Sequence, residues 1–258
     1  MENPWIRINR PLIIAHRGNG VLTPENTLAA YQQAFEDGAE MIETDVNISK
    51  DSHLVIIHDS TLDRTTNLSG NVHDYTLDEL QQADAGTWFN VKFKGERIPT
   101  VQDALLFSKE KSMPMCFEVK GLGTLRSTQI ARQLVQLIED DDAFDRVFFS
   151  SYYHDALAVA KKLAPQLMLA PERLPDDVEP DIQEALRQAQ SLNAEVLQLH
   201  YRYLYPDVLK SLHEANIAVW AWPTTTEDEI MPAIKTGADG VMGDDPALAK
   251  KLVNQLCK

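Results

Sequence analysis

Several short apolar runs of this 258-residue chain end in ionisable residues instead of ordinary turn residues. Residues two apart on a strand share one face, so each acidic or acid–base pair of this kind points to one side of its strand. Histidine titrates near neutral pH, which suits general acid–base catalysis, and arginine and lysine bind phosphate or carboxylate groups. The residues are His16 and Arg17, Glu43 and Asp45, His58 and Asp59, and Glu118 and Lys120. They indicate a site that moves protons on an anionic substrate.

Three of these acids predict a metal site. If Glu43, Asp45 and Glu118 converge in a buried place, desolvation and mutual repulsion would cost several kcal/mol for each. A divalent cation removes that cost, and an all-oxygen ligand set favours Mg²⁺ or Ca²⁺, with Mn²⁺ as a further option. Salt bridges with Arg17 and Lys120 are the alternative explanation. Two cysteines in the whole sequence are too few for a disulfide framework or a thiolate zinc cluster.

The segments that must position these residues alternate along the chain between β-rich runs and helical patterns. Such alternation predicts a parallel sheet covered on both faces. The β-rich runs are 12–16, 41–46, 54–59, 115–120, 146–151, 167–172, 195–200, 217–222 and 239–243, and helical patterns include 27–37, 128–140, 155–163, 182–192, 206–216 and 227–235.

The runs 41–46 and 54–59 are too close together for a parallel crossover. They should form an antiparallel hairpin that turns near 50–53, and a pairing of residue 46 with 57 would place Asp45 opposite His58. Without the returning strand, eight parallel strands remain. That number closes a (β/α)8 TIM barrel, whose active sites lie at the C-terminal ends of the strands.

Residues 60–97 do not follow the alternation. They are polar, and Thr76 with Glu79 forms a helix-start capping box. We expect a small insertion over the barrel mouth, within a single domain that spans 1–258. Its aromatic residues either form a lid or pack the insertion onto the barrel; they are Trp88, Phe89 and Phe93.

The net charge is −15. Nucleic-acid backbones and anionic membrane surfaces repel such a protein, so neither nucleic acid nor a stable membrane association is expected. No apolar stretch approaches the roughly 18 residues of a membrane span, and the first residues lack a signal-peptide pattern. We expect a cytoplasmic protein with a small-molecule substrate, and its oligomeric state stays open.

The motifs, taken in order, resemble those of the glycerophosphodiester phosphodiesterase family. Each motif alone is common, whereas the ordered set is specific. They are HRG (16–18), PENT (24–27), E-x-D (43–45), HD (58–59) followed by LDRTT (62–66), and E-x-K (118–120), with a weaker likeness through 150–151, Trp222 and 237–240. The chain departs from the family pattern at 222–225, which reads Trp-Pro-Thr-Thr, and at Gly243-Asp244. Both departures concern substrate-side contacts.

The resemblance implies a barrel related to the phosphatidylinositol-specific phospholipases C that hydrolyses glycerophosphodiesters to glycerol 3-phosphate and an alcohol. It implies a role for each matching residue: Glu43, Asp45 and Glu118 as metal ligands, His16 and His58 as the acid–base pair, Arg17 and Lys120 as phosphate ligands, and Trp222 on the glycerol side.

Two other functions stay open. A lysophospholipase D would act on acylated glycerophosphodiesters through an apolar channel, and a non-catalytic barrel would bind phosphate alone. Two polar residues have alternative roles as well. Asn26 either reaches the site or caps the following helix, the simpler expectation, and His200 either lines the pocket or is a structural residue at the rim.

Overall fold

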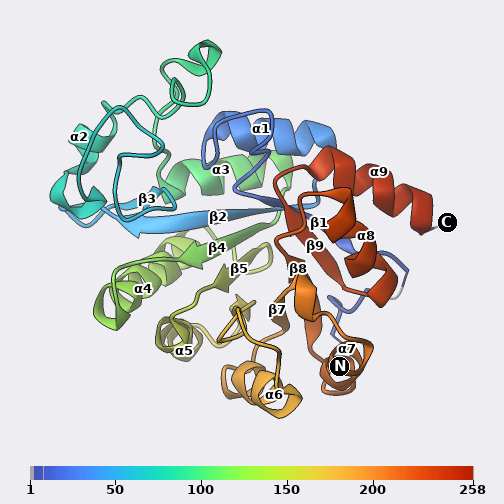
Figure 1. Cartoon of the computed structure of the whole chain (residues 1–258). Coiled ribbons are helices and arrows are strands. Elements are labelled where there is room, and N and C mark those ends of the chain that lie inside the picture. Colours follow the sequence, from blue (N-terminus) through green and yellow to red (C-terminus); the bar gives the residue numbers. More distant parts are fainter. Residues whose placement is uncertain (1–2, 8, 258) are drawn as a thin grey trace.

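Parallel strands form a nearly closed barrel in this computed structural model, which describes residues 3–7 and 9–257 (Figure 1). Within those residues, eight parallel strands lie inside a ring of helices, and the predicted (β/α)8 fold class is confirmed. The strands are β1 Leu12–His16, β2 Met41–Ile48, β3 Leu54–Ile56, β4 Met115–Val119, β5 Val147–Ser150, β6 Met168–Leu169, β7 Val196–His200, β8 Ala218–Trp222 and β9 Gly240–Gly243. The helices are α1 Leu28–Asp37, α2 Leu77–Leu80, α3 Val101–Lys111, α4 Thr124–Asp140, α5 His154–Leu163, α6 Ile182–Ser191, α7 Pro206–Glu214, α8 Glu227–Thr236 and α9 Pro246–Leu256.

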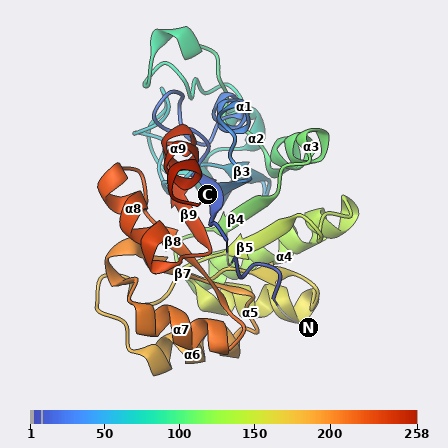
Figure 2. The same ribbon diagram turned by 90° about the vertical axis from the view of Figure 1, so that its right-hand side faces the viewer.

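The ring closes between β6 and β7. The hydrogen-bonded strand order is β6-β5-β4-β2-β1-β9-β8-β7, and β3 pairs with β2 outside this path. Past the short strand β6, the backbone N–H of Gln198 donates to the carbonyl of Pro171 at 2.9 Å, and that of Arg173 donates to the carbonyl of Gln198 at 3.0 Å. These bonds complete the barrel where regular strand pairing has stopped. Figure 2 shows the helices on the outside of the strands from a second direction.

The barrel interior is apolar at the N-terminal end of the strands and ionisable at the C-terminal end. Along β2 the residues of one face are Met41, Glu43 and Asp45, all buried. The apolar layer below the site is a cluster that includes Leu12, Ile14, Met41, Cys116, Phe148 and Trp220. Trp220 fits there because Gly240 has no side chain: a Cβ at Gly240 would lie 2.5 Å from the indole ring. Each such large apolar residue contributes about 1.5–3 kcal/mol by its burial.

The predicted hairpin is present, but its register differs by one residue. Val46 pairs with Ile56, and the N–H of Ile57 donates to the carbonyl of Asp45 at 3.0 Å, so Asp45 lies opposite Ile57 and not His58. The turn uses three residues, 50–52, since Ser49 and His53 are joined by a backbone hydrogen bond. Ser52 takes a left-handed φ of 66°, the geometry of a three-residue hairpin loop. The expected four-residue turn was therefore one residue too long.

Residues 60–97 pack beside β3 at the edge of the barrel mouth (Figure 1). They contain α2, whose Thr76–Glu79 capping box is present, and two short 3₁₀ turns at Val72–Asp74 and Val91–Phe93. The outer face of the hairpin and this segment share an apolar cluster of Val55, Ile57, Leu62, Val72, Leu80, Ala83, Ala85 and Ile98. Thr100 caps α3, where the barrel resumes as expected.

None of the described helices combines the length and the apolar character needed to cross a membrane.

Candidate active site

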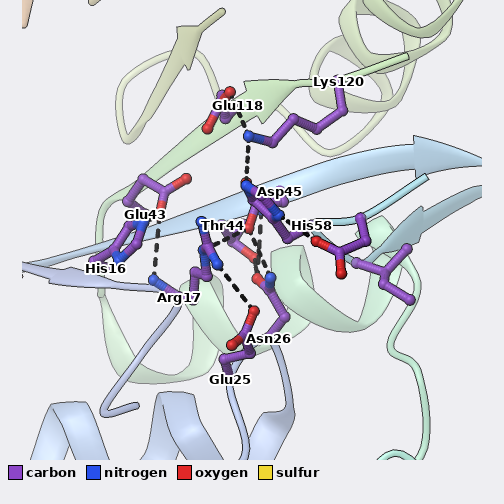
Figure 3. A network of polar contacts seen from close by, with 12 residues as sticks. His16, Arg17, Glu25, Asn26, Glu43, Thr44, Asp45, His58, Glu118 and Lys120 are labelled. Atoms are coloured by element: carbon purple, nitrogen blue, oxygen red, sulfur yellow. Dashed lines mark hydrogen bonds and ion pairs between the residues drawn. The ribbon is translucent and has the colours of Figure 1, made fainter. Parts of the chain in front are cut away.

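The ionisable strand ends meet around one cavity at the C-terminal mouth of the barrel (Figure 3). The cavity holds about 370 Å³ of empty space. Asp45 lies below it, fully buried and in contact with two of the lining side chains. The lining residues are His16, Arg17, Glu43, His58, Glu118, Lys120, Tyr152, Glu172, Gln198, Trp222 and Met242. All eight residues singled out from the sequence are thus brought together.

Glu43, Asp45 and Glu118 form a cluster of buried acids. One carboxylate oxygen from each lies within 4.8 Å of the other two. Burial, with repulsion from Asp45 and Glu118, raises the pKa of Glu43 well above its usual range. Burial also raises the pKa of Glu118, against the opposing effect of Lys120. Such a cluster disfavours its own ionised form and needs positive charge.

Two side-chain cations supply part of that charge. Arg17 Nε lies 3.1 Å from Asp45 Oδ2, and Lys120 Nζ lies 3.1 Å from Asp45 Oδ1 and 2.6 Å from Glu118 Oε1. Burial alone would raise the pKa of Asp45, but Lys120 and Arg17 outweigh it and hold that pKa below its usual range. The salt bridges that were the alternative explanation of the acids are therefore present.

These salt bridges leave Glu43 unsatisfied. Its Oε1 is buried and has no hydrogen-bond partner among the described residues, whereas Oε2 accepts from the Arg17 N–H at 3.2 Å. Three acids face two cations, so full ionisation of the cluster requires one further positive charge. Carboxylate oxygens are the donors that Mg²⁺ and Ca²⁺ prefer, and the residues present fit such a cation.

His16 is held by Asp244, which the sequence analysis named only as a departure on the substrate side. Asp244 Oδ1 lies 2.7 Å from His16 Nδ1, and the Asp244 N–H donates to Thr225 Oγ1 at 3.1 Å. His16 Nε2 lies 3.9 Å from Glu43 Oε2, on the metal-site side. If Nδ1 carries the proton given to Asp244, Nε2 is free to accept one. Asp244 directly follows β9, and that strand-end position was the signal available in the sequence.

His58 reaches the site from outside the closed ring. It follows β3, and its Nδ1 lies 2.7 Å from Asp59 Oδ1. Burial lowers the pKa of His58, while Asp45 and Asp59 act in the opposite direction. Figure 3 shows His58 beside Asp45 and across the site from His16, so the two histidines approach from different sides.

Of the two roles considered for Asn26, the structure favours the one at the site over the simpler expectation of a helix cap. Its side-chain amide donates to Asp45 Oδ2 at 2.7 Å, and its Oδ1 accepts from Thr44 Oγ1 at 2.8 Å. Thr27, the next residue, is the N-cap of α1. Asn26 has a left-handed φ of 58°, which aims its side chain at β2.

The far wall of the cavity carries Trp222 and two residues that the sequence analysis did not select, Glu172 and Gln198. Glu172 Oε2 is buried without a hydrogen-bond partner among the described residues, and burial raises its pKa well above the usual range. Glu172 ends the predicted run 167–172, so the strand-end rule could have found it. His200 packs its ring 5.7 Å from that of Trp222 and is not among the lining residues, which favours the structural role at the rim.

A second cavity adjoins the first. It shares His58, Glu118, Lys120 and Tyr152 with the first and opens outward past Leu122. The aromatic residues of the insertion line neither cavity. Trp88 and Phe89 contact each other at 5.7 Å between ring centres, and Phe89 and Phe93 at 5.8 Å. They therefore pack against one another within the insertion, and the expectation of a lid finds no support in either cavity.

Comparison with known proteins agrees with this geometry. Residues 16–248 match the model of the glycerophosphoryl diester phosphodiesterase family. A curated glycerophosphodiester phosphodiesterase of Caldanaerobacter subterraneus is 36% identical over 95% of this chain and 99% of its own length. One from Bacillus altitudinis is 31% identical over 95% and 98%. The solved structure of an Oleispira antarctica phosphodiesterase with the product sn-glycerol-3-phosphate has a TM-score of 0.86, with 28% identity over 95% of this chain and 97% of that one. The chain belongs to the glycerophosphoryl diester phosphodiesterase family.

Proposed function

We propose that this protein hydrolyses glycerophosphodiesters to glycerol 3-phosphate and an alcohol, with a divalent cation and histidine acid–base catalysis. The observation that carries the proposal is the unpartnered carboxylate oxygen of Glu43, in a three-acid cluster that lies between two oriented histidines. The names of the curated relatives and the product complex of the Oleispira enzyme support the substrate class.

His16 is the proposed base. Its Nδ1 is held by Asp244, so Nε2 can take the proton of the glycerol 2-hydroxyl. The hydroxyl oxygen then attacks phosphorus as the bond to the alcohol oxygen breaks, which gives a cyclic phosphate. Water opens the cyclic phosphate in a second step, with the proton transfers reversed.

Arg17 and Lys120 are the proposed phosphate ligands. Both line the cavity and lie beside the acid cluster. Their charges favour an anionic phosphoryl group, whose negative charge grows in the transition state. A divalent cation held by Glu43, Asp45 and Glu118 would act as a Lewis acid on a phosphoryl oxygen.

His58 is the proposed acid for the leaving alcohol. Its Nδ1 is held by Asp59, which leaves Nε2 for a proton that passes to the alkoxide. Because His58 lines both cavities, we assign glycerol to the first, next to Trp222, and the alcohol to the second. The alternative function, a lysophospholipase D, would need an apolar channel formed by the aromatic residues of the insertion, and these residues line neither cavity.

We also propose a single domain over 1–258 and a cytoplasmic location. The location agrees with two free cysteines, the buried Cys116 and the half-buried Cys257.

A coupled assay of glycerol 3-phosphate release tests the reaction. Purified protein is offered a panel of glycerophosphodiesters after exhaustive EDTA treatment, then with Mg²⁺, Ca²⁺ or Mn²⁺ added back. We expect turnover that depends on added cation, since the three acids need one in order to act on phosphate. Full activity after chelation would return the acids to a salt-bridge role, and inactivity on every diester with every cation would refute the reaction.

Replacement of His16 by alanine tests the acid–base assignment. We expect kcat to fall about 10²–10⁴-fold, the usual loss when a general base is removed. The matched control is His53→Ala, since His53 directly follows the hairpin turn, with a half-exposed side chain paired to Asp51. A His16→Ala enzyme with near-normal kcat would remove this histidine from the mechanism.

A further inference from the structure

Arg64, in the segment after β3, binds two acids at once. Its Nε and Nη2 donate to Asp59 at 2.7 and 3.1 Å, and its Nη1 and Nη2 donate to Glu25 at 2.8 and 2.9 Å. Asp59 comes from the hairpin side of the mouth, whereas Glu25 comes from the loop between β1 and α1. One guanidinium therefore joins two loops that are separate in sequence.

Each of the two acids also holds a residue of the proposed mechanism. Asp59 Oδ1 lies 2.7 Å from His58 Nδ1, and Glu25 Oε1 accepts from Arg17 Nη1 at 3.0 Å. The chain of contacts thus runs from His58 through Asp59, Arg64 and Glu25 to Arg17. Figure 3 shows the Arg17 end of this chain, with Glu25 below the guanidinium.

We propose that Arg64 is a positioning residue: it fixes Asp59 and Glu25 so that His58 and Arg17 face the same phosphoryl group. This inference rests on the proposed function of the site. Arg64 itself lines neither cavity and, among the described contacts, touches none of the three clustered acids. It reaches the second cavity only through Asp59, so it acts through its two partners.

The guanidinium shape explains why arginine stands here. Its planar fork presents several N–H donors in fixed directions and can satisfy two carboxylates, whereas a lysine ammonium offers one compact charge. Arg64 also keeps both acids ionised: it lowers the pKa of Asp59 to about 2 and, against the effect of burial, lowers that of Glu25. The arginine side chain is 44% exposed, and exposed ion pairs add little to stability. Its loss should therefore disturb geometry more than folding.

The test is Arg64→Ala in the coupled assay with saturating cation. We expect kcat/KM to fall about 10–100-fold, as for other residues that orient catalytic groups, with kcat carrying much of the loss because His58 acts in the chemical step. Thermal unfolding should shift little. Millimolar guanidinium should restore part of the activity of Arg64→Ala, and Arg64→Lys should recover less than the full rate.

Two controls separate positioning from a general effect. Arg97→Ala removes another exposed arginine of the same segment, one whose Nη1 donates to the Gln81 carbonyl at 2.6 Å, and it should keep wild-type kinetics. In a chain that carries Glu25→Gln and Asp59→Asn, Arg64→Ala should lower kcat/KM little further, because the partners through which Arg64 acts are already neutral.

Activity of Arg64→Ala within about threefold of wild type would overturn the inference, as would a loss that follows a large drop in thermal stability and resists guanidinium. A wild-type protein without diesterase activity would instead refute the proposed function. The two failures are therefore distinguishable.

Discussion

At the scale of one residue, the buried carboxylate of Glu43 lowers the stability of the fold at the proposed metal site. Its carboxylate is buried, lies near two further acids and has one oxygen without a hydrogen-bond partner among the described residues. Arg17 and Lys120 compensate two of the three charges. Without a cation, the third charge opposes folding, which is typical of functional sites.

Replacement of Glu43 by glutamine should therefore have opposite effects on stability and on cation binding. The neutral amide of similar shape removes the repulsion, so the melting temperature of the metal-free protein should stay equal or rise by a few degrees, the size expected for about 1 kcal/mol in a domain of this length. The rise in melting temperature on addition of Mg²⁺ or Ca²⁺ should be lost.

Thermal unfolding with and without cation measures both effects. Glu36→Gln is the matched control on the exposed side of α1, where the carboxylate accepts only from the neighbouring Gln32 among the described contacts. A Glu43→Gln protein that keeps the full cation-induced shift would show that Glu43 is not a ligand.

The residues that meet at the cavity could be predicted because ionisable groups stand at the ends of apolar strands. Their orienting partners could not. Asp244 contacts His16 across 228 positions of sequence, and only the closed barrel brings them together. Asn26 was misassigned because an asparagine before a helix usually caps it, while the left-handed φ that turns it toward Asp45 has no simple sequence signal.

At the scale of elements, α7 is tied to β9 by a buried acid. His213 Nε2 lies 2.7 Å from Asp239 Oδ2, and Asp239 also accepts from the N–H groups of Arg7 and Val219 at 2.6 and 2.7 Å. The hydrogen bond that Asp239 accepts from His213 raises the pKa of His213. This pair lies away from the mouth, so its titration concerns folding alone.

A pH dependence of stability follows. A histidine whose pKa is raised in the folded state stabilises fully below its unfolded pKa of about 6.5, and that contribution is lost as pH rises through the folded-state pKa. Because His213 is partly exposed, we expect this loss of stability to be small and to begin as pH rises above about 6.5.

Urea unfolding of the wild type and of His213→Gln at several pH values measures what this pair contributes to the free energy of unfolding. The variant should lack that part of the decline, since glutamine does not titrate. Equal slopes against pH for the two proteins would show that the pair contributes nothing across this range.

Strand identity could be read from the apolar runs, yet strand register could not. The residues from 54 onward were assigned to the correct hairpin, and the pairing was wrong by one because Ser52 closes the turn with a left-handed backbone. Strand β6 is shorter than its run 167–172 suggested, since backbone bonds around Gln198 take over its pairing.

At the scale of the whole molecule, the alternation of β-rich and helical segments was sufficient to predict the barrel fold. The family model matches residues 16–248. The net charge of the chain is −15, but the charge at the cavity differs from this overall value. Arg17 and Lys120 face the cavity, and with a bound cation they would reverse the local field, which lets a strongly acidic protein accept an anionic substrate. Composition alone could not place these charges.

The surface loop 50–52 has no role in the proposed reaction, yet the hairpin register constrains its length. Strand β3 leads to His58, and a strand's two faces exchange whenever the register moves by one position. A single inserted residue that shifted this register would turn Leu54 and Ile56 out of the core. The His58 side chain would then lie on the opposite face of the strand. The residue types at 50–52 are therefore less constrained than their number, because the number sets the side on which His58 reaches the cavity.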